Sequence, residues 1–181
     1  EHMPMTALVR NLAKMTAVGL FKPMGEATKR AAAQLADAEA IRKARLHPMT
    51  ALVALKTYDQ GHGDKGSLAW TPVREIVDAL NDAFYLAFDA IEPTGKNHLL
   101  ALDVSGSMSA AIAGMPISCR DATAVLAMVT ARAEKNWHVV AFQNRLTPLA
   151  ISPKQRLDDV IRTISGLSFG GTDCALPMLY A

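Results

Sequence analysis

Length, composition and charge narrow the classes of protein to which this chain can belong. Its 181 residues include 19 basic and 17 acidic side chains, and 50% of the residues are hydrophobic. A nearly neutral, half-apolar chain is neither a disordered polyelectrolyte nor a basic tail, so any nucleic-acid site has to be a local patch.

Targeting signals and cysteine scaffolds are not evident in the sequence. No apolar run approaches the roughly 20 residues that span a bilayer, and the first residues lack a basic segment followed by a long apolar one. We therefore expect a soluble, cytoplasmic chain with no membrane partner. Cys119 and Cys174 are the only cysteines in the sequence, which excludes a disulfide scaffold or a four-cysteine zinc site. Both lie in apolar context, which predicts two reduced core thiols.

The first half of the chain has the pattern of a helical protein. From Met5 to Ile91 the apolar residues recur at helical spacing. The predicted elements in chain order are a helix with an apolar stripe over 8–18, helices over 26–35, 37–46, 48–58 and 71–91, and a glycine-rich loop over 61–66. Thr71 as a capping hydroxyl and Pro72 as first helical residue predict the start of the last helix. These helices suit a compact bundle or a stack of helical hairpins, and no internal repeat is clear enough to choose between them.

The second half changes to an alternation of strands and helices. The apolar run 98–102 predicts a buried strand, Ser118 with Asp121 has capping-box spacing at the start of a helix through 132, and 137–142 predicts a second strand. Residues 146–151 could pair with that strand, a helix follows over 157–164, and an apolar stretch covers 175–180. This order predicts a mostly parallel, doubly wound α/β sheet, whose ligands bind at the carboxyl ends of its strands.

One constellation of side chains carries recognisable chemistry. Asp103, Ser105 and Ser107 alternate along an extended loop directly after the first strand, so one carboxylate and two hydroxyls project from the same side. Oxygen ligands alone select a hard cation, with Mg²⁺ favoured and Mn²⁺ possible. Thr172, behind Gly170 and Gly171, is the best donor to complete the ligand shell. The sequence lacks the flanking glycines of a nucleophile elbow, and it contains no phosphate-binding loop motif. No nucleophile–base pair and no acid–base pair of carboxylates stands out at a recognisable spacing. We therefore do not expect an enzyme.

These residues carry a resemblance to two known families. The segments LALDVSGSM at 100–108 and GGTD at 170–173 resemble a von Willebrand factor A domain with its metal-ion-dependent adhesion site (MIDAS). The helical half resembles the end of a TROVE module, the ring of HEAT-like repeats of the Ro 60-kDa autoantigen family and its bacterial, Rsr-type relatives. That likeness rests on the segments PMTALVRNL at 4–12, ARLHP at 44–48, TYDQGHG at 57–63 and PTGK at 93–96.

The resemblance implies a fold class, two modules and a function. The fold class is an α-helical HEAT-like repeat segment over 1–95, followed over 96–181 by the first part of an α/β doubly wound domain. The implied function is non-catalytic RNA binding in a ribonucleoprotein, with small Y RNAs, single-stranded ends of misfolded RNAs and an exoribonuclease as partners and no DNA. Asp103, Ser105, Ser107 and Thr172 match the metal-site motif residue by residue.

The resemblance also implies that the A domain is truncated at its C-terminus. The family pattern has a further aspartate after a fourth strand, beyond the final residue of this chain. A sheet of only three strands would leave the 99–102 strand as an open apolar edge. We therefore expect a further chain or a swapped segment to cover that edge.

Basic residues of the helical half are the candidate RNA contacts. The candidates are Arg42, Lys43, Arg45, His47 and Lys65. Composition alone favours a solvated helix face with cations near a helix carboxyl end, whereas the family resemblance favours phosphate contacts. A second hypothesis for the whole chain is a metal-dependent protein-binding A module in which RNA has no role.

Overall fold

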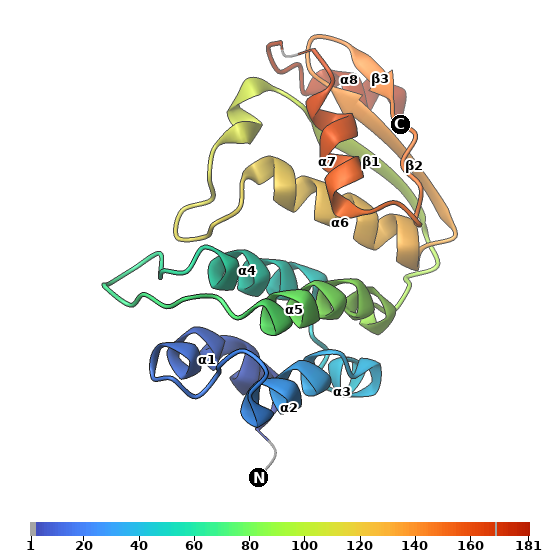
Figure 1. The fold of residues 1–181 in the computed structure, drawn as a ribbon. Coiled ribbons are helices and arrows are strands. Elements are labelled where there is room, and N and C mark those ends of the chain that lie inside the picture. Colours follow the sequence, from blue (N-terminus) through green and yellow to red (C-terminus); the bar gives the residue numbers. More distant parts are fainter. Residues whose placement is uncertain (1–2, 169) are drawn as a thin grey trace. The chain divides into compact units, whose positions relative to one another are not determined.

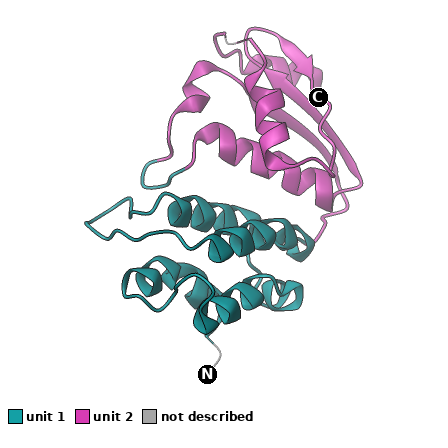
Figure 2. Cartoon of the chain, in the orientation of Figure 1, with its two compact units in different colours: residues 1–91, 113–116 teal, residues 92–112, 117–181 magenta. Residues whose placement is uncertain are grey.

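The computed structural model describes residues 3–168 and 170–181, which form two compact units. Unit 1 contains residues 1–91 and 113–116, and unit 2 contains residues 92–112 and 117–181 (Figure 2). The division after Ile91 lies close to the predicted module boundary at residue 95, which stays a prediction. No helix in the described residues is long and apolar enough to cross a membrane.

Apart from an isolated β-bridge between His62 and Ala69, the regular elements described in unit 1 are all helices (Figure 1). Helix α5 packs against α2, α3 and α4, and α1 packs against α4 and α2. The helices are α1 (Met5–Ala17), α2 (Glu26–Leu35), α3 (Ala38–Lys43), α4 (Pro48–Asp59), α5 (Arg74–Leu86) and the short 3₁₀ helix η1 (Ala87–Ala90).

Local capping explains where two of these helices begin. The Asp37 carboxylate accepts hydrogen bonds from two backbone N–H groups of the first turn of α3, and Nδ1 of His47 accepts the N–H of Met49 at the start of α4. Pro48 occupies the first turn of α4, where a missing N–H costs nothing. His47 is therefore a capping residue as well as a candidate RNA contact.

The core of unit 1 is centred on Tyr58, which is 2% exposed. Its hydroxyl is 2.8 Å from Oγ1 of Thr16 and accepts the N–H of Val73 at 3.2 Å. The indole N–H of Trp70 donates to the Tyr58 carbonyl oxygen at 2.9 Å. One tyrosine thus joins α1, α4 and the segment that leads into α5.

Three sequence-based expectations for unit 1 were wrong in detail. Helix α5 begins at Arg74 rather than at Pro72, because Val73 is extended and gives its N–H to Tyr58, a partner distant in sequence. The same helix gives way to η1 after Leu86 instead of continuing to residue 91. Val18, expected on the buried stripe of α1, is 65% exposed because the helix ends before it.

Unit 2 is a three-stranded sheet with helices packed against it. Strands β1 and β2 are parallel, with Asp103 opposite Phe142, and the short β3 runs antiparallel to β2. The elements are β1 (Asn97–Asp103), the 3₁₀ helix η2 (Gly106–Ser109), α6 (Cys119–Ala133), β2 (Asn136–Phe142), β3 (Leu146–Pro148), α7 (Leu157–Ser165) and α8 (Ala175–Tyr180). The predicted helix-then-α/β order is confirmed.

Helices cover the two faces of this sheet differently (Figure 1). Helix α6 packs on β1 and β2, and α7 packs on α6. Helix α8 contacts β2, where the ring of Tyr180 stacks on His138. Strand β1 pairs only with β2 among the described residues, so its other edge is open, and Leu99 on it is 36% exposed.

Both cysteines were expected in the core, and this expectation was wrong. Cys119 is half-buried and Cys174 is exposed, and both are free. Cys119 opens α6 and Cys174 precedes the exposed helix α8, so their apolar neighbours in sequence are not all core residues.

Candidate functional site

The candidate metal site lies at the carboxyl end of β1. Asp103 is the last residue of the strand, and the chain continues extended through Val104, whose N–H donates to the Phe142 carbonyl oxygen at 3.2 Å. Ser105 follows and is only 4% exposed. The structure therefore holds Asp103 and the two serines against the sheet edge, where the strand order predicted them.

Two hydrogen bonds link the three residues of this loop. Oδ1 of Asp103 accepts the Ser105 N–H at 2.7 Å, and the hydroxyl oxygens of Ser105 and Ser107 are 3.0 Å apart. Within residues 3–168 and 170–181, the second carboxylate oxygen of Asp103 makes no hydrogen bond. The loop thus presents two paired hydroxyl oxygens and one unused carboxylate oxygen.

The donor set fits a small divalent cation. Mg²⁺ binds oxygen at about 2.0–2.1 Å in octahedral geometry, which places neighbouring ligand oxygens about 2.9 Å apart. The two serine hydroxyl oxygens already have nearly that separation, at 3.0 Å. The described residues contain no cluster of three or more His, Cys, Asp or Glu side chains that would hold a metal. Any cation at β1 would therefore depend on hydroxyl oxygens and water as well as on Asp103.

Thr172 belongs to a loop that is held at the same sheet edge. The N–H of Asp173 donates to the carbonyl oxygen of Gln143, the first residue after β2, at 2.9 Å. Because β1 and β2 run parallel and Asp103 lies opposite Phe142, both loops are at the carboxyl edge of the sheet. The side chain of Thr172 is exposed, and its role as fourth ligand stays a prediction.

Two residues that the sequence reasoning missed shape this loop. A Cβ atom added at Gly170 would collide with Oε1 of Gln143, and one added at Gly171 would lie 2.8 Å from Oδ1 of Asn144. The Gln143 side chain is also tied to Ser168, to which its Nε2 donates at 3.1 Å. A polar Gln-Asn pair directly after an apolar strand, matched by a later Gly-Gly, is the signal that could have identified this close approach.

The candidate RNA contacts of unit 1 do not all lie together. The first four, from Arg42 to His47, are exposed and lie between the last turn of α3 and the N-cap of α4. Lys65 is exposed in the loop beyond the other end of α4, a helix of 12 residues and therefore about 18 Å long. The structure brings the first four together and separates Lys65 from them.

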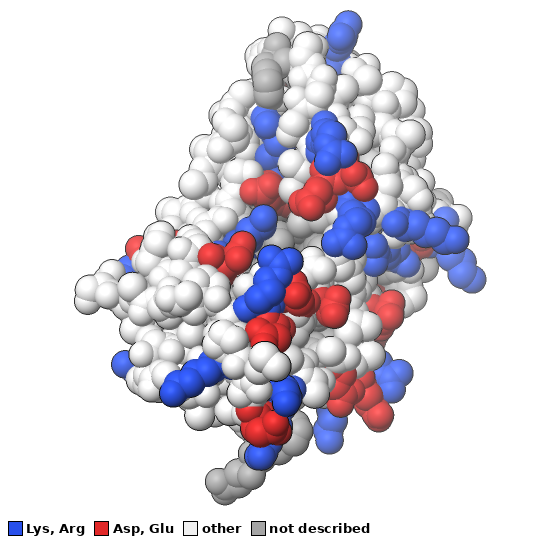
Figure 3. Space-filling model, in the orientation of Figure 1, with Lys and Arg blue, Asp and Glu red and all other residues white. Residues whose placement is uncertain are grey.

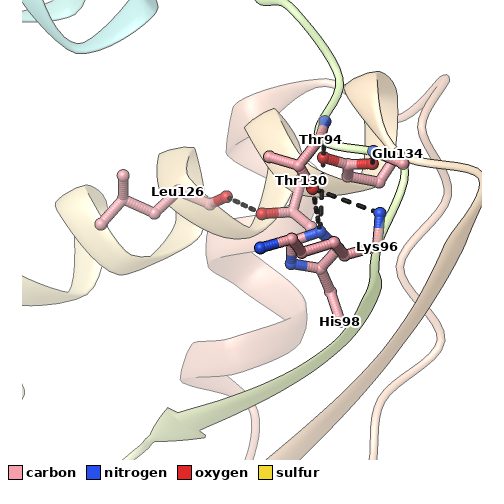
Figure 4. A network of polar contacts seen from close by, with 7 residues as sticks. Thr94, Lys96, His98, Leu126, Thr130 and Glu134 are labelled. Carbon is pink, nitrogen blue, oxygen red and sulfur yellow. Dashed lines mark hydrogen bonds and ion pairs between the residues drawn. The ribbon is translucent and has the colours of Figure 1, made fainter.

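Glu134 is a further buried polar residue that the sequence reasoning missed. It follows the last residue of α6, and its side chain is only 5% exposed. Its carboxylate accepts the N–H groups of Thr94 at 2.6 Å and Gly95 at 3.0 Å, and lies 3.3 Å from Nε2 of His98 (Figure 4). These bonds, the one from Thr94 first, lower the pKa of the Glu134 carboxyl. An acidic side chain at the carboxyl end of a helix is unfavourable because its charge opposes the helix dipole. The position of Glu134 after α6 was therefore the signal in the sequence that this side chain has a specific partner.

Two family models match separate parts of the chain. The Ro60 vWA domain matches residues 97–181, and the TROVE domain matches residues 1–57. The first match contains the Asp103 loop and the Thr172 loop, and the second contains the cations from Arg42 to His47.

Curated proteins and a solved structure resemble the chain over nearly its whole length. It is 45% identical over 181 residues to "RNA-binding protein RO60" of Caenorhabditis elegans, covering 99% of this chain and 28% of that protein. It is 41% identical over 180 residues to "RNA-binding protein RO60" of Deinococcus radiodurans, covering 98% of this chain and 34% of that protein. The crystal structure of the Deinococcus radiodurans RO (RSR) protein matches with a TM-score of 0.91 and 40% identity, covering 99% of this chain and 37% of that one. The chain thus spans about a third of the length of these relatives.

Proposed function

We propose that this chain, which belongs to the Ro60 family through a TROVE segment and part of a vWA domain, binds RNA without catalysing a reaction. The observation that carries the proposal is the joint match of both family domains along one chain, together with two relatives whose names state RNA binding. The expected partners are small Y-type RNAs and single-stranded ends of misfolded RNAs, with an exoribonuclease as a protein partner. A cytoplasmic location is part of this proposal.

The exposed cations between α3 and α4 are the first proposed RNA contacts. Arg42, Lys43 and Arg45 are exposed, and Arg45 has a left-handed backbone (φ 49°). A phosphate contact by a cation adds affinity irrespective of base sequence, and that affinity falls with salt. Lys65 would add a separate contact at the far end of α4.

Charge reversal of these cations tests the RNA proposal. We expect Arg45→Glu with Lys65→Glu to weaken binding of a hairpin RNA with a single-stranded 3′ end by about tenfold or more near 0.1 M salt. Filter binding across a salt series measures this. The matched control is Lys14→Glu with Lys22→Glu, which makes the same charge change on two other exposed lysines of unit 1. Equal RNA affinity of the unmodified chain, the Arg45/Lys65 variant and the control variant would show that Arg45 and Lys65 do not contact the RNA.

A divalent cation at the Asp103 loop is the second part of the proposal. Asp103, Ser105, Ser107 and Thr172 would hold it, and when bound it would supply a Lewis-acidic position for an anionic oxygen. The supporting observation is the 3.0 Å separation of the two serine hydroxyls beside the unused carboxylate oxygen of Asp103. Mg²⁺ is favoured, with Mn²⁺ as the alternative.

The same loop supports the alternative function, a metal-dependent protein-binding module without an RNA role. In that case the open coordination position accepts an Asp or Glu of a partner protein. Asp103→Ala separates the two functions in the same filter assay. If this variant still binds RNA with unchanged affinity and salt dependence, the cations of unit 1 are the RNA contacts. If it no longer binds RNA, the RNA binds at the Asp103 loop. Absence of RNA binding by the unmodified chain, combined with Mg²⁺-dependent capture of an acidic peptide, would favour the protein-binding alternative.

A further inference from the structure

A second group of cations gathers on unit 2, at the edge of the sheet opposite to the candidate metal site. We call it the amino-edge patch. It lies where β1 and β2 begin, where α6 ends and where the turn before α7 passes. Its members are Lys96, Arg132, Lys135, Lys154 and Arg156, all exposed except the half-buried Arg132.

The strand register and one hydrogen bond bring these cations together. Asn97 of β1 lies opposite Asn136 of β2, so Lys96 and Lys135, the residues just before them, are at adjacent strand ends. The guanidinium of Arg132 donates to the Gln155 carbonyl oxygen at 3.2 Å, which places the turn carrying Lys154 and Arg156 beside the end of α6. In Figure 3, Lys and Arg side chains gather at this corner of unit 2.

A cavity opens between the two lysines at the strand ends. Its volume is about 460 Å³, and its lining includes Pro93, Lys96, Ala133, Lys135 and Asn136. Cavities of roughly 300–1,000 Å³ hold small organic ligands, so this one has room for a nucleotide unit. The two ammonium groups supply positive charge at its wall.

The acidic residue that lines this cavity, Glu134, offsets only part of that charge. Both carboxylate oxygens of Glu134 are engaged by Thr94 and Gly95, and the His98 ring lies on the same carboxylate (Figure 4). The side chain is 5% exposed and points away from solvent. With Glu134, the exposed acids Glu92 and Asp158 on the flanking segments make three carboxylates against five cations, so the patch keeps an excess of positive charge.

The composition of the patch selects among anionic partners. Protein interfaces depend on buried apolar or aromatic anchors, and membrane-surface helices insert apolar side chains. Among the described residues, none of the exposed large hydrophobic side chains lies within the segments 93–96, 132–136 and 152–156 that form the patch. A polyanion with regularly spaced phosphates needs only the cations.

We propose that the amino-edge patch binds the phosphate backbone of single-stranded RNA, with one nucleotide unit in the cavity between Lys96 and Lys135. This inference rests on the proposed RNA-binding function and adds a contact surface in unit 2 to the cations of unit 1. The bond network of Glu134 fixes the segment before β1 that forms one wall of the cavity, so the two lysines act from a rigid support.

Neutralising the two lysines tests the inference on the full chain. The probe is a 20-nucleotide oligouridylate, measured by filter binding over a salt series for the unmodified chain and for Lys96→Gln with Lys135→Gln. Loss of two phosphate contacts lowers the salt slope by about 1.4 and the affinity at 0.1 M salt by about tenfold or more. Lys14→Gln with Lys22→Gln is the control, because it changes the net charge by the same amount. The single variant Lys154→Gln is expected to lower the RNA affinity by a smaller factor. Thermal unfolding checks that each variant is folded.

The possible outcomes separate this inference from the proposed function. If the unmodified chain binds the RNA and the Lys96/Lys135 variant keeps its affinity and slope, the inference is overturned and the proposed function stands. If the unmodified chain binds no RNA, both the inference and the proposed function are contradicted. Binding to vesicles with 30% phosphatidylserine that depends on Lys96 and Lys135, with RNA binding unaffected, would assign the patch to lipid headgroups and also overturn the inference.

Discussion

Glu134 is the residue on which the start of unit 2 depends. One carboxylate accepts hydrogen bonds from two backbone N–H groups of the segment 94–95 and lies next to His98, the second residue of β1. Truncation of this buried side chain removes the acceptor of both backbone N–H groups at once, so its cost is larger than the loss of one hydrogen bond.

The pKa of Glu134 gives its contribution a defined pH dependence. Hydrogen bonds lower the pKa of this carboxyl in the folded protein, so its stabilisation is complete above the ordinary carboxyl pKa and is lost as the pH falls through the lowered value. We expect Glu134→Gln to lower the melting temperature at pH 7 and the difference from the unmodified chain to shrink below about pH 4. Calorimetry from pH 3 to 8 measures both.

An exposed carboxylate provides the control for that series. Among the described residues Glu26 bonds only to Lys29, and its side chain is 75% exposed, so Glu26→Gln is expected to change the melting temperature little at any pH. A Glu134→Gln effect that stayed constant from pH 3 to 8 would contradict the assigned role of the charge.

At the scale of elements, the sequence was most informative where partners are close in the chain. The capping box of Ser118 and Asp121 and the loop with Asp103 follow from local spacing, and the parallel β1–β2 pair follows from the strand–helix–strand order. The start of α5 was misplaced because Val73 gives its N–H to Tyr58, 15 residues earlier. The support of the Gly170–Gly171 turn by Gln143 was missed for the same reason, since no local pattern encodes a contact between distant loops.

That turn gives a prediction about the loop elements of the candidate site. Gly170→Ala places a methyl group against Oε1 of Gln143, a side chain that is only 7% exposed and cannot swing away freely. We expect a loss of about 1–3 kcal/mol in the free energy of unfolding, measured by urea denaturation. Gln143→Ala in the same chain should recover part of the Gly170→Ala loss, as a non-additive double-mutant cycle.

Gly106 supplies the matched control for the glycine substitution. A Cβ atom added there meets no atom of the described residues within 4 Å, and the φ of Gly106 is not in the left-handed region. Gly106→Ala should therefore be neutral or slightly stabilising. Equal destabilisation at both positions would mean that crowding by Gln143 is not the cause.

At the scale of the whole molecule, the open edge of β1 governs how the chain behaves with other copies. A parallel strand with unpaired backbone groups and an exposed leucine is a template for pairing with another strand. The expected further chain or swapped segment at this edge stays a prediction. It implies self-association of the chain when no other strand is supplied.

Leu99→Lys tests that behaviour. A lysine on an edge strand opposes strand-to-strand pairing, so we expect the variant to shift the chain toward monomer in light scattering over a concentration series. Leu126→Lys is the control, because Leu126 is 53% exposed but lies on α6 rather than on the sheet edge. A dilute, well-folded monomer of the unmodified chain would contradict the expectation.

The two tryptophans are divided between the two units. Trp70 is enclosed in unit 1, where its indole N–H is bonded to Tyr58, and Trp137 lies half-buried in β2 of unit 2. Replacing either one with phenylalanine leaves a single tryptophan, and its emission reports on one unit alone when the excitation wavelength is one that the three tyrosines hardly absorb. The loss of structure in the helical part and in the α/β part can therefore be followed separately, by ultraviolet excitation, in the intact chain.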